Sequence, residues 1–245
     1  DLSGVLAPPY DVISDELQDA LYERNPHNVI RLILGKQYPS DSDSNNRYSR
    51  AKETLESWKE NGTLVKDTTP SFYLYEHDYK AKEGGRKRLI GLVGVIEAVP
   101  FSEGVVLPHE NTLSGPIEDR LSLMKSCKSN LSQVFTLFCD EENRFRALIE
   151  SELDKQPLYD IPFQEDTYRV WRLSETALIE QLELFFQDKT LLIADGHHRY
   201  TTALHYKDFC RQQGAELQSQ SDYMMVFLSN LFDEGLNLYP THRVC

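Results

Sequence analysis

"LLIADGHHRYTTAL", residues 191–204, predicts a buried strand that turns directly into a helix. The apolar run within 190–194 is typical of a strand that is covered on both faces. Asp195 and Gly196 form the turn, and helical spacing then continues over 197–213. Because buried strands that alternate with helices are the building units of α/β proteins, this segment sets the expected fold class.

Helices and strands alternate along the rest of the chain. The runs 71–79 and 88–99 are rich in β-forming residues and flank Gly84-Gly85, which predicts a hairpin and makes the expected sheet mixed. We therefore expect an α/β fold of α+β character with a mixed sheet. Further strands are predicted at 28–34, 131–139, 167–173 and 223–229, and a short strand followed by a loop at 105–112. Further helices are predicted after Ser14, from Tyr48 to Trp58, at 117–128, at 141–153 and after Ser174.

Composition excludes several classes of protein. The chain has 245 residues and a formal net charge of −13, which argues against a nucleic-acid-binding protein, because phosphate backbones bind basic surfaces. No apolar run approaches the ~20 residues of a membrane span, and the sequence predicts no secretory signal peptide. The four cysteines are not closely paired in sequence, which favours a reducing cytoplasm. The chain begins without Met, so we expect a fragment of a longer protein.

The start of the 197–213 helix has the chemistry of an anion site. The first N–H groups of a helix lack partners and lie at the positive end of its dipole. Gly196 allows the backbone to approach a ligand closely, and Arg199 can form a forked contact with phosphate or carboxylate oxygens. His197 and His198 add donors, but neighbouring helix positions diverge by about 100°, so we do not expect them to share one metal ion. Asp195 can hold Mg²⁺ or take a proton.

Two further polar clusters follow strand-like runs. In "LPHENT" (107–112), Glu110 is a candidate general base and His109 a candidate phosphate or metal contact. In "YPTHR" (239–243), the candidate ligand-binding residues are Thr241, His242 and Arg243. The glycine-rich phosphate loops, the HExxH zinc motif, the GxSxG elbow and the protein-kinase motifs are all missing.

These segments together resemble a known family, domain of unknown function 1015, over essentially the whole chain. That family is similar to the ParB/sulfiredoxin-like superfamily. The resemblance implies an accessory lobe at 1–88 and a ParB-like phosphate-binding domain at 89–245, with an insertion at about 113–170. The segments that carry it are "APPYDVI" (7–13), "NPHNVIRL" (25–32), "LPHENT" (107–112), "DRLSLM" (119–124), "IADGHHRYTTAL" (193–204) and "LYPTHR" (238–243).

The family in turn resembles free-serine kinase, which transfers phosphate from ADP or ATP to L-serine. The resemblance implies that Glu110 and Asp195 are catalytic, and that Asp195 also contacts Mg²⁺. It implies that Thr241, His242 and Arg243 bind the substrate. The expected partners are the nucleotide, a small-molecule substrate and a second copy of the chain in a homodimer, with neither nucleic acid nor membrane. The implied nucleotide- and phosphate-binding residues are His109, Gly196, His197, His198 and Arg199.

Two other functions stay open on the residues alone. Asp195, His197, His109 and Glu110 are possible ligands of a metal-dependent hydrolase, because Asp-x-His is a workable pair at a turn. A nucleotide-binding sensor or scaffold without catalysis would need the same anion site.

Overall fold

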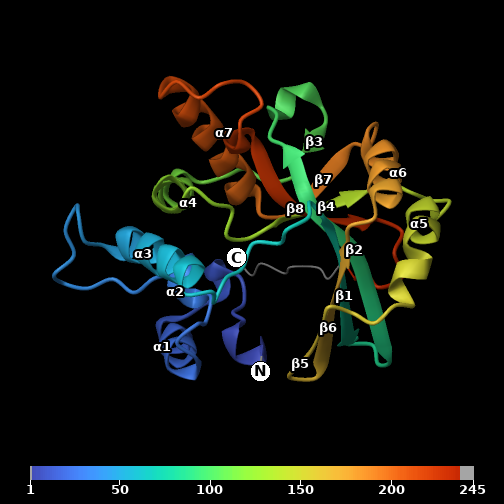
Figure 1. Cartoon of the computed structure of the whole chain (residues 1–245), viewed down its shortest axis with the longest axis horizontal. Coiled ribbons are helices and arrows are strands. Elements are labelled where there is room, and N and C mark those ends of the chain that lie inside the picture. Colours follow the sequence, from blue (N-terminus) through green and yellow to red (C-terminus); the bar gives the residue numbers. More distant parts are fainter. Residues whose placement is uncertain (1, 238–245) are drawn as a thin grey trace, which may run out of the picture.

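The computed structural model describes residues 2–237, which form a mixed eight-stranded sheet with seven α-helices (Figure 1). The α/β prediction is therefore confirmed. The strands are β1 (Phe72–Lys80), β2 (Arg86–Glu97), β3 (Val106–Leu107), β4 (Val134–Phe138), β5 (Tyr159–Phe163), β6 (Asp166–Leu173), β7 (Leu191–Asp195) and β8 (Tyr223–Asn230). The helices are α1 (Asp15–Arg24), α2 (Ile30–Ile33), α3 (Arg47–Glu60), α4 (Ser114–Cys127), α5 (Arg144–Leu153), α6 (Thr176–Phe186) and α7 (His197–Gln212).

The sheet has the strand order β3-β7-β4-β8-β2-β1-β6-β5. The pairs β3–β7 and β4–β8 are parallel, and the other neighbours are antiparallel. Helices α5 and α6 lie on one side of the sheet in Figure 1, whereas α4 and α7 lie on the other side, above α1, α2 and α3. The β1–β2 hairpin turns at Gly84 and Gly85, as the sequence predicts, and both glycines have positive φ.

Two apolar clusters hold these layers together. The larger cluster joins the strands to α5, α6 and α7, and its fully buried members include Leu92, Phe138, Ile193 and Tyr200. The Tyr200 hydroxyl also accepts the Val99 N–H and donates to the Val99 carbonyl, at 3.0 and 2.9 Å. The smaller cluster packs the N-terminal helices on α4; it contains Leu32, Ala51, Leu55, Trp58, Leu123 and Cys127.

The strand predicted at 28–34 is wrong, because Ile30–Ile33 is the short helix α2. A brief apolar run does not distinguish a strand from a buried helical turn, and Ile30, Leu32 and Ile33 are all buried. The decision comes from buried Asn28, whose Oδ1 accepts the Ile30 N–H at 3.0 Å while its Nδ2 donates to the carbonyls of Gly4 and Leu6.

Smaller differences concern single elements. Helix α6 begins one residue after the position that Ser174 would cap, with Glu175 at its N-cap and no side-chain cap. Strand β5 was not predicted; it is a short edge strand that contains Pro162. Proline donates no ladder hydrogen bond, and an edge strand tolerates this because one of its two sides has no neighbouring strand. Among the described residues, Cys127, Cys139 and Cys210 are free thiols.

Two features of the sheet bear on the domain boundaries that the sequence predicts. The expected boundary at residue 88 falls inside β2, which pairs with β1 from Tyr73–Val93 to Lys80–Arg86. The expected insertion at about 113–170 contains β4, which lies between β7 and β8 in the sheet. The accessory lobe and the ParB-like core stay predictions. Up to residue 60 the described chain contributes helices and no strand to the sheet.

Gly91 provides a direct test of the sheet packing. A Cβ atom at this position would lie 2.3 Å from the Phe227 ring and 2.4 Å from the Leu228 carbonyl oxygen. We expect Gly91→Ala to lower the free energy of unfolding by about 1–3 kcal/mol, because backbone and ring must both move. In the control Gly115→Ala, nothing lies within 4 Å of the new atom and the position is helical, so the free energy of unfolding should rise by up to about 1 kcal/mol. Urea unfolding measures both, and equal effects would contradict this register.

Candidate functional site

The turn between β7 and α7 has a backbone that only glycine adopts easily. Gly196 has φ +95° and is the N-cap of α7, and no side chain caps the first N–H groups of this helix. The Arg199 guanidinium lies 2.9 Å from the place that a Cβ atom of residue 196 would take. Glycine is therefore needed both for the turn and for the position of Arg199 over it.

The parallel pairing of β3 with β7 brings a distant loop to this turn. Val106 pairs with Leu191, and Leu107 pairs with Leu192. Because parallel strands end at the same edge of a sheet, the loop that follows β3 lies beside the start of α7. The loop carries His109 and Glu110, so the structure brings the "LPHENT" and "DGHHR" segments together.

Both histidines of α7 hold this loop through its backbone. His197 Nε2 accepts the His109 N–H at 3.2 Å, and His198 Nε2 accepts the Leu113 N–H at 3.1 Å. A ring nitrogen that accepts a hydrogen bond carries no proton, so each ring is neutral with its proton on Nδ1. The sequence did not indicate Leu113, because a backbone donor has no side-chain signature.

Glu110 lies in the loop after β3, close to His109 and His197. Its Oε2 atom is 3.5 Å from His197 Nδ1, and its Oε1 atom is 4.0 Å from His109 Nε2. The rings of His109 and His197 meet edge to face at 4.5 Å. His197 is buried, with 3 % of its side chain exposed, whereas Glu110 is 62 % exposed. A carboxylate that solvent and a ligand can reach therefore lies beside a buried imidazole.

The surroundings of His197 shift the pKa of its imidazole. Burial lowers the pKa of His197, and the neighbouring His109 lowers it further, whereas the carboxylates of Glu110 and Asp195 oppose the shift. The net shift is downward, which agrees with the neutral ring that the His109 hydrogen bond requires.

Asp195 and Arg199 form an ion pair across the first turn of α7. Arg199 also donates to the Gln133 carbonyl oxygen, and its side chain is 15 % exposed. Asp195 is 57 % exposed. The Arg199 fork is thus already positioned at the turn, and an incoming anion would share it with Asp195.

Two further segments that carry the family resemblance, 7–13 and 119–124, also contribute residues near Arg199. Arg120, on α4, lines a small cavity together with Arg199, and its guanidinium lies over the Tyr10 ring at 4.0 Å. Burial raises the pKa of Tyr10, while the charges of Arg120 and Arg199 oppose the shift. Asp119 pairs with Arg120 and also with Arg47, which ties α3 and α4 together beside the site.

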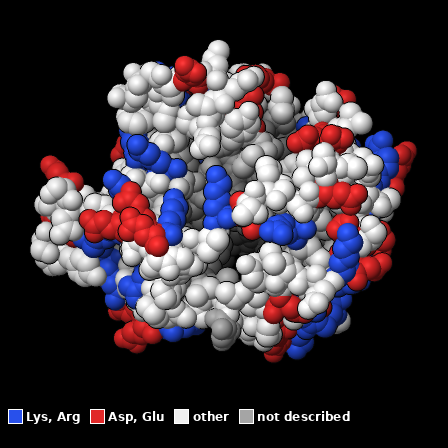
Figure 2. Space-filling view, in the orientation of Figure 1, with Lys and Arg blue, Asp and Glu red and all other residues white. Residues whose placement is uncertain are grey.

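One face of the molecule carries both basic and acidic side chains (Figure 2), although the chain as a whole is acidic. Figure 2 shows Lys and Arg side chains beside a hollow near the centre of this face, between the helices on the left and the strands on the right. Within residues 2–237, no three His, Cys, Asp or Glu side chains group closely enough to hold a metal ion. In the same range, no helix is both long and apolar enough to cross a membrane. Thr241, His242 and Arg243 lie outside the described residues.

The comparison with known families gives one match. A family described as "Protein of unknown function (DUF1015)" matches the chain over residues 1–245. No curated protein and no solved structure matches the chain.

The neutral histidine predicts a pH dependence of stability. His197 takes up a proton near its ordinary pKa of 6.5 when the chain is unfolded, but only at lower pH when it is folded, where His109, His198, Glu110 and Asp195 surround it. The unfolded state therefore binds more protons, and the free energy of unfolding falls as the pH drops below about 6.5.

Urea unfolding at pH 7.5, 6.5 and 5.5 measures this loss. His197→Gln keeps an acceptor but cannot titrate, so its free energy of unfolding should fall less over this range than that of the wild type. An identical fall in both proteins would show that His197 does not lose a proton on folding.

Proposed function

The chain belongs to the DUF1015 family, and on that premise we propose that it is a nucleotide-dependent phosphotransferase. It transfers a phosphoryl group from ADP or ATP to the hydroxyl group of a small molecule such as L-serine, with Mg²⁺ as cofactor. The ParB-like core and the likeness to free-serine kinase are part of this proposal.

One observation carries the proposal: the Glu110 carboxylate lies 3.5 Å from His197, in the first turn of α7, although a long stretch of chain separates them. Phosphoryl transfer needs a phosphate clamp and a base beside the acceptor hydroxyl. The uncapped N–H groups after Gly196 supply the clamp, and Glu110 supplies the base.

The geometry suggests a division of roles. The acceptor hydroxyl oxygen attacks the terminal phosphorus, its proton passes to Glu110, and the bond from phosphorus to the leaving phosphate breaks. Backbone N–H groups of α7 and the Arg199 fork stabilise the charge on the transferring group. His197 and His198 act mainly as positioning residues, because their Nε2 atoms are occupied by loop N–H groups.

Asp195 fits the expected Mg²⁺ contact. Mg²⁺ keeps several water ligands and is usually held by one or two carboxylates together with substrate phosphates, so a three-residue cluster is not required. Asp195 is 57 % exposed at the end of β7, beside the phosphate clamp. Bound Mg²⁺ would neutralise charge on the phosphates; Asp195 would hold it and release part of the Arg199 fork for the nucleotide.

The direct test incubates the protein with ADP or ATP, Mg²⁺ and L-serine, and detects phosphoserine by mass spectrometry. A panel of other hydroxylated small molecules tests the acceptor. Tight nucleotide binding without any product would favour the sensor, and metal that remains bound in stoichiometric amount after purification would favour the hydrolase.

Glu110→Gln should lower kcat at least about 100-fold, because the amide cannot accept the hydroxyl proton. The Kd for the nucleotide should stay within about twofold, since Glu110 does not contact the phosphates in this scheme. Glu118→Gln is the matched control, because it removes an equal charge from an exposed position on α4. Normal turnover by the Glu110 variant would remove this residue from the base role.

Arg199→Lys tests the phosphate clamp. The lysine keeps the positive charge but loses the planar fork, so the nucleotide Kd should rise about tenfold. The control is Arg144→Lys, at a 63 % exposed arginine outside the site, which should leave the Kd unchanged. Calorimetric titration measures both, and equal affinities would separate Arg199 from nucleotide binding.

A further inference from the structure

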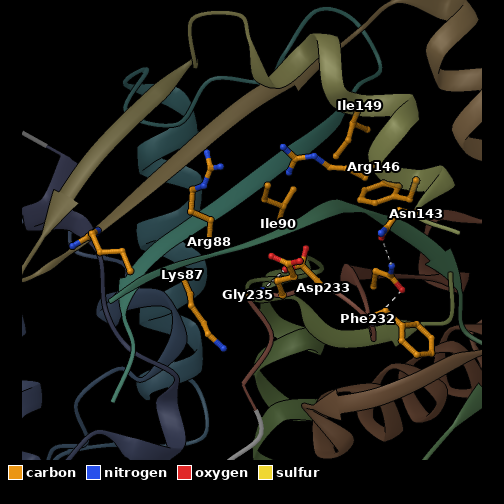
Figure 3. Close-up of a pocket in the computed structure, with 13 residues that line it drawn as sticks. Lys87, Arg88, Ile90, Asn143, Arg146, Ile149, Phe232, Asp233 and Gly235 are labelled. Carbon is orange, nitrogen blue, oxygen red and sulfur yellow. Dashed lines mark hydrogen bonds between the residues drawn. The ribbon is translucent and has the colours of Figure 1, made fainter. Parts of the chain in front are cut away.

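A large cavity among the described residues lies away from the candidate site. Its volume is about 690 Å³, and its walls come from the start of β2, the first turns of α5 and the segment that follows β8 (Figure 3). It shares no residue with the cluster around Glu110 and Arg199. Asn230, at the edge of the cavity, is the last residue of β8. Asp195 of the candidate site is opposite Phe135 of β4, which pairs with Phe227, an earlier residue of β8. A cavity of this size is within the range of small-molecule sites.

Two arginines from different elements point into this cavity. Figure 3 shows the side chain of Arg146, from α5, extending toward Arg88, from β2, across the upper part of the cavity. Hydrogen bonds from Arg146 lower the pKa of Glu150, and the charge of Arg88 adds to the effect, so both guanidinium groups act on the same region.

Neither arginine is committed to a strong partner. Arg88 is 60 % exposed and lies 3.7 Å from Glu76, but Glu76 is already paired with Arg169. Arg146 donates two hydrogen bonds to Glu150, from Nε at 2.9 Å and from Nη2 at 3.5 Å. This is an exposed pair four residues apart on one helix, which contributes little to stability. A ligand can therefore contact Arg88 directly and would exchange with Glu150 at Arg146.

The acidic groups of the wall are few. Asp233 directs its Oδ1 atom to the Gly235 N–H at 2.7 Å, and burial raises the pKa of its carboxyl group. Glu234 is the other acidic residue of the wall, against Arg86, Lys87, Arg88 and Arg146. In a chain of net charge −13, this cavity is locally cationic.

The remaining wall is apolar. Ile90, Phe145 and Ile149 line the cavity and belong to the main core, so they form a rigid apolar floor. Rigid apolar walls with a few convergent polar groups are typical of sites for small organic ligands.

We propose that this cavity binds a small organic anion as a second ligand site of the protein. Its phosphate or carboxylate group is held between the guanidinium groups of Arg88 and Arg146. Its uncharged part lies on the apolar floor. The two arginines favour a ligand with an oxyanion group, because their planar guanidinium groups match the spacing of phosphate and carboxylate oxygens.

Phenyl phosphate, benzoate and inorganic phosphate are the probes. Calorimetric titration of the wild-type chain should show phenyl phosphate or benzoate binding more tightly than inorganic phosphate, because only they cover the floor. The stronger of the two identifies the oxyanion. No binding of either at about 10 mM, or an equal affinity for inorganic phosphate, would overturn the proposal.

Arg88→Gln and Arg146→Gln should each raise the Kd of the stronger probe about tenfold, since each removes one charged fork. Arg144→Gln removes the same charge from the same helix outside the cavity and should leave the Kd within about twofold. Arg88→Lys, which keeps the charge, should weaken binding less than Arg88→Gln. Thermal unfolding verifies that each variant is folded, and unchanged Kd values in both glutamine variants would overturn the proposal.

The second site does not depend on phosphotransfer. Arg199→Gln should leave the probe affinity unchanged, whereas a probe that binds at α7 would lose affinity in this variant. Loss in Arg199→Gln with no loss in Arg88→Gln would assign the probe to the candidate active site and overturn the second site. Absence of kinase activity would leave the arginine result unaffected.

Discussion

Two backbone hydrogen bonds define the candidate site, from the N–H groups of His109 and Leu113 to the Nε2 atoms of His197 and His198. They fasten the loop after β3 onto the first turn of α7, so a carboxylate and an anion-binding helix start share one place. The bonds require neutral imidazoles, and burial of His197 favours that state because it penalises the charged ring. Without them, Glu110 would belong to an exposed loop with no fixed relation to α7.

This constraint changes the meaning of the double histidine. Adjacent helix positions diverge, and each ring accordingly reaches a different point of the same loop, His109 in one case and Leu113 in the other. Two neighbouring histidines thus act as a two-point clamp rather than as a metal pair. The charged contact to phosphate in our proposal is left to Arg199, whose guanidinium already lies against Gly196.

Local signals in the sequence were sufficient for most elements. Ser14 caps α1 and accepts the Leu17 N–H, and the glycine pair forms the hairpin turn, because caps and turns depend on neighbouring residues only. The strand predicted at 28–34 was wrong because that choice does not depend on neighbouring residues alone. Its apolar residues suit either a strand or a helical turn, and the contacts of Asn28 with the distant Gly4 and Leu6 decided between them.

By itself the sequence determined the strand–turn–helix around Gly196 and the residue types of the site, since backbone sterics, helix ends and side-chain chemistry are local properties. Only the tertiary structure decided that Glu110 meets His197, because that contact depends on the parallel register of β3 against β7, which no local pattern encodes. It also decided that Arg88 and Arg146 face one cavity, since they come from a strand and a helix that are far apart in the chain.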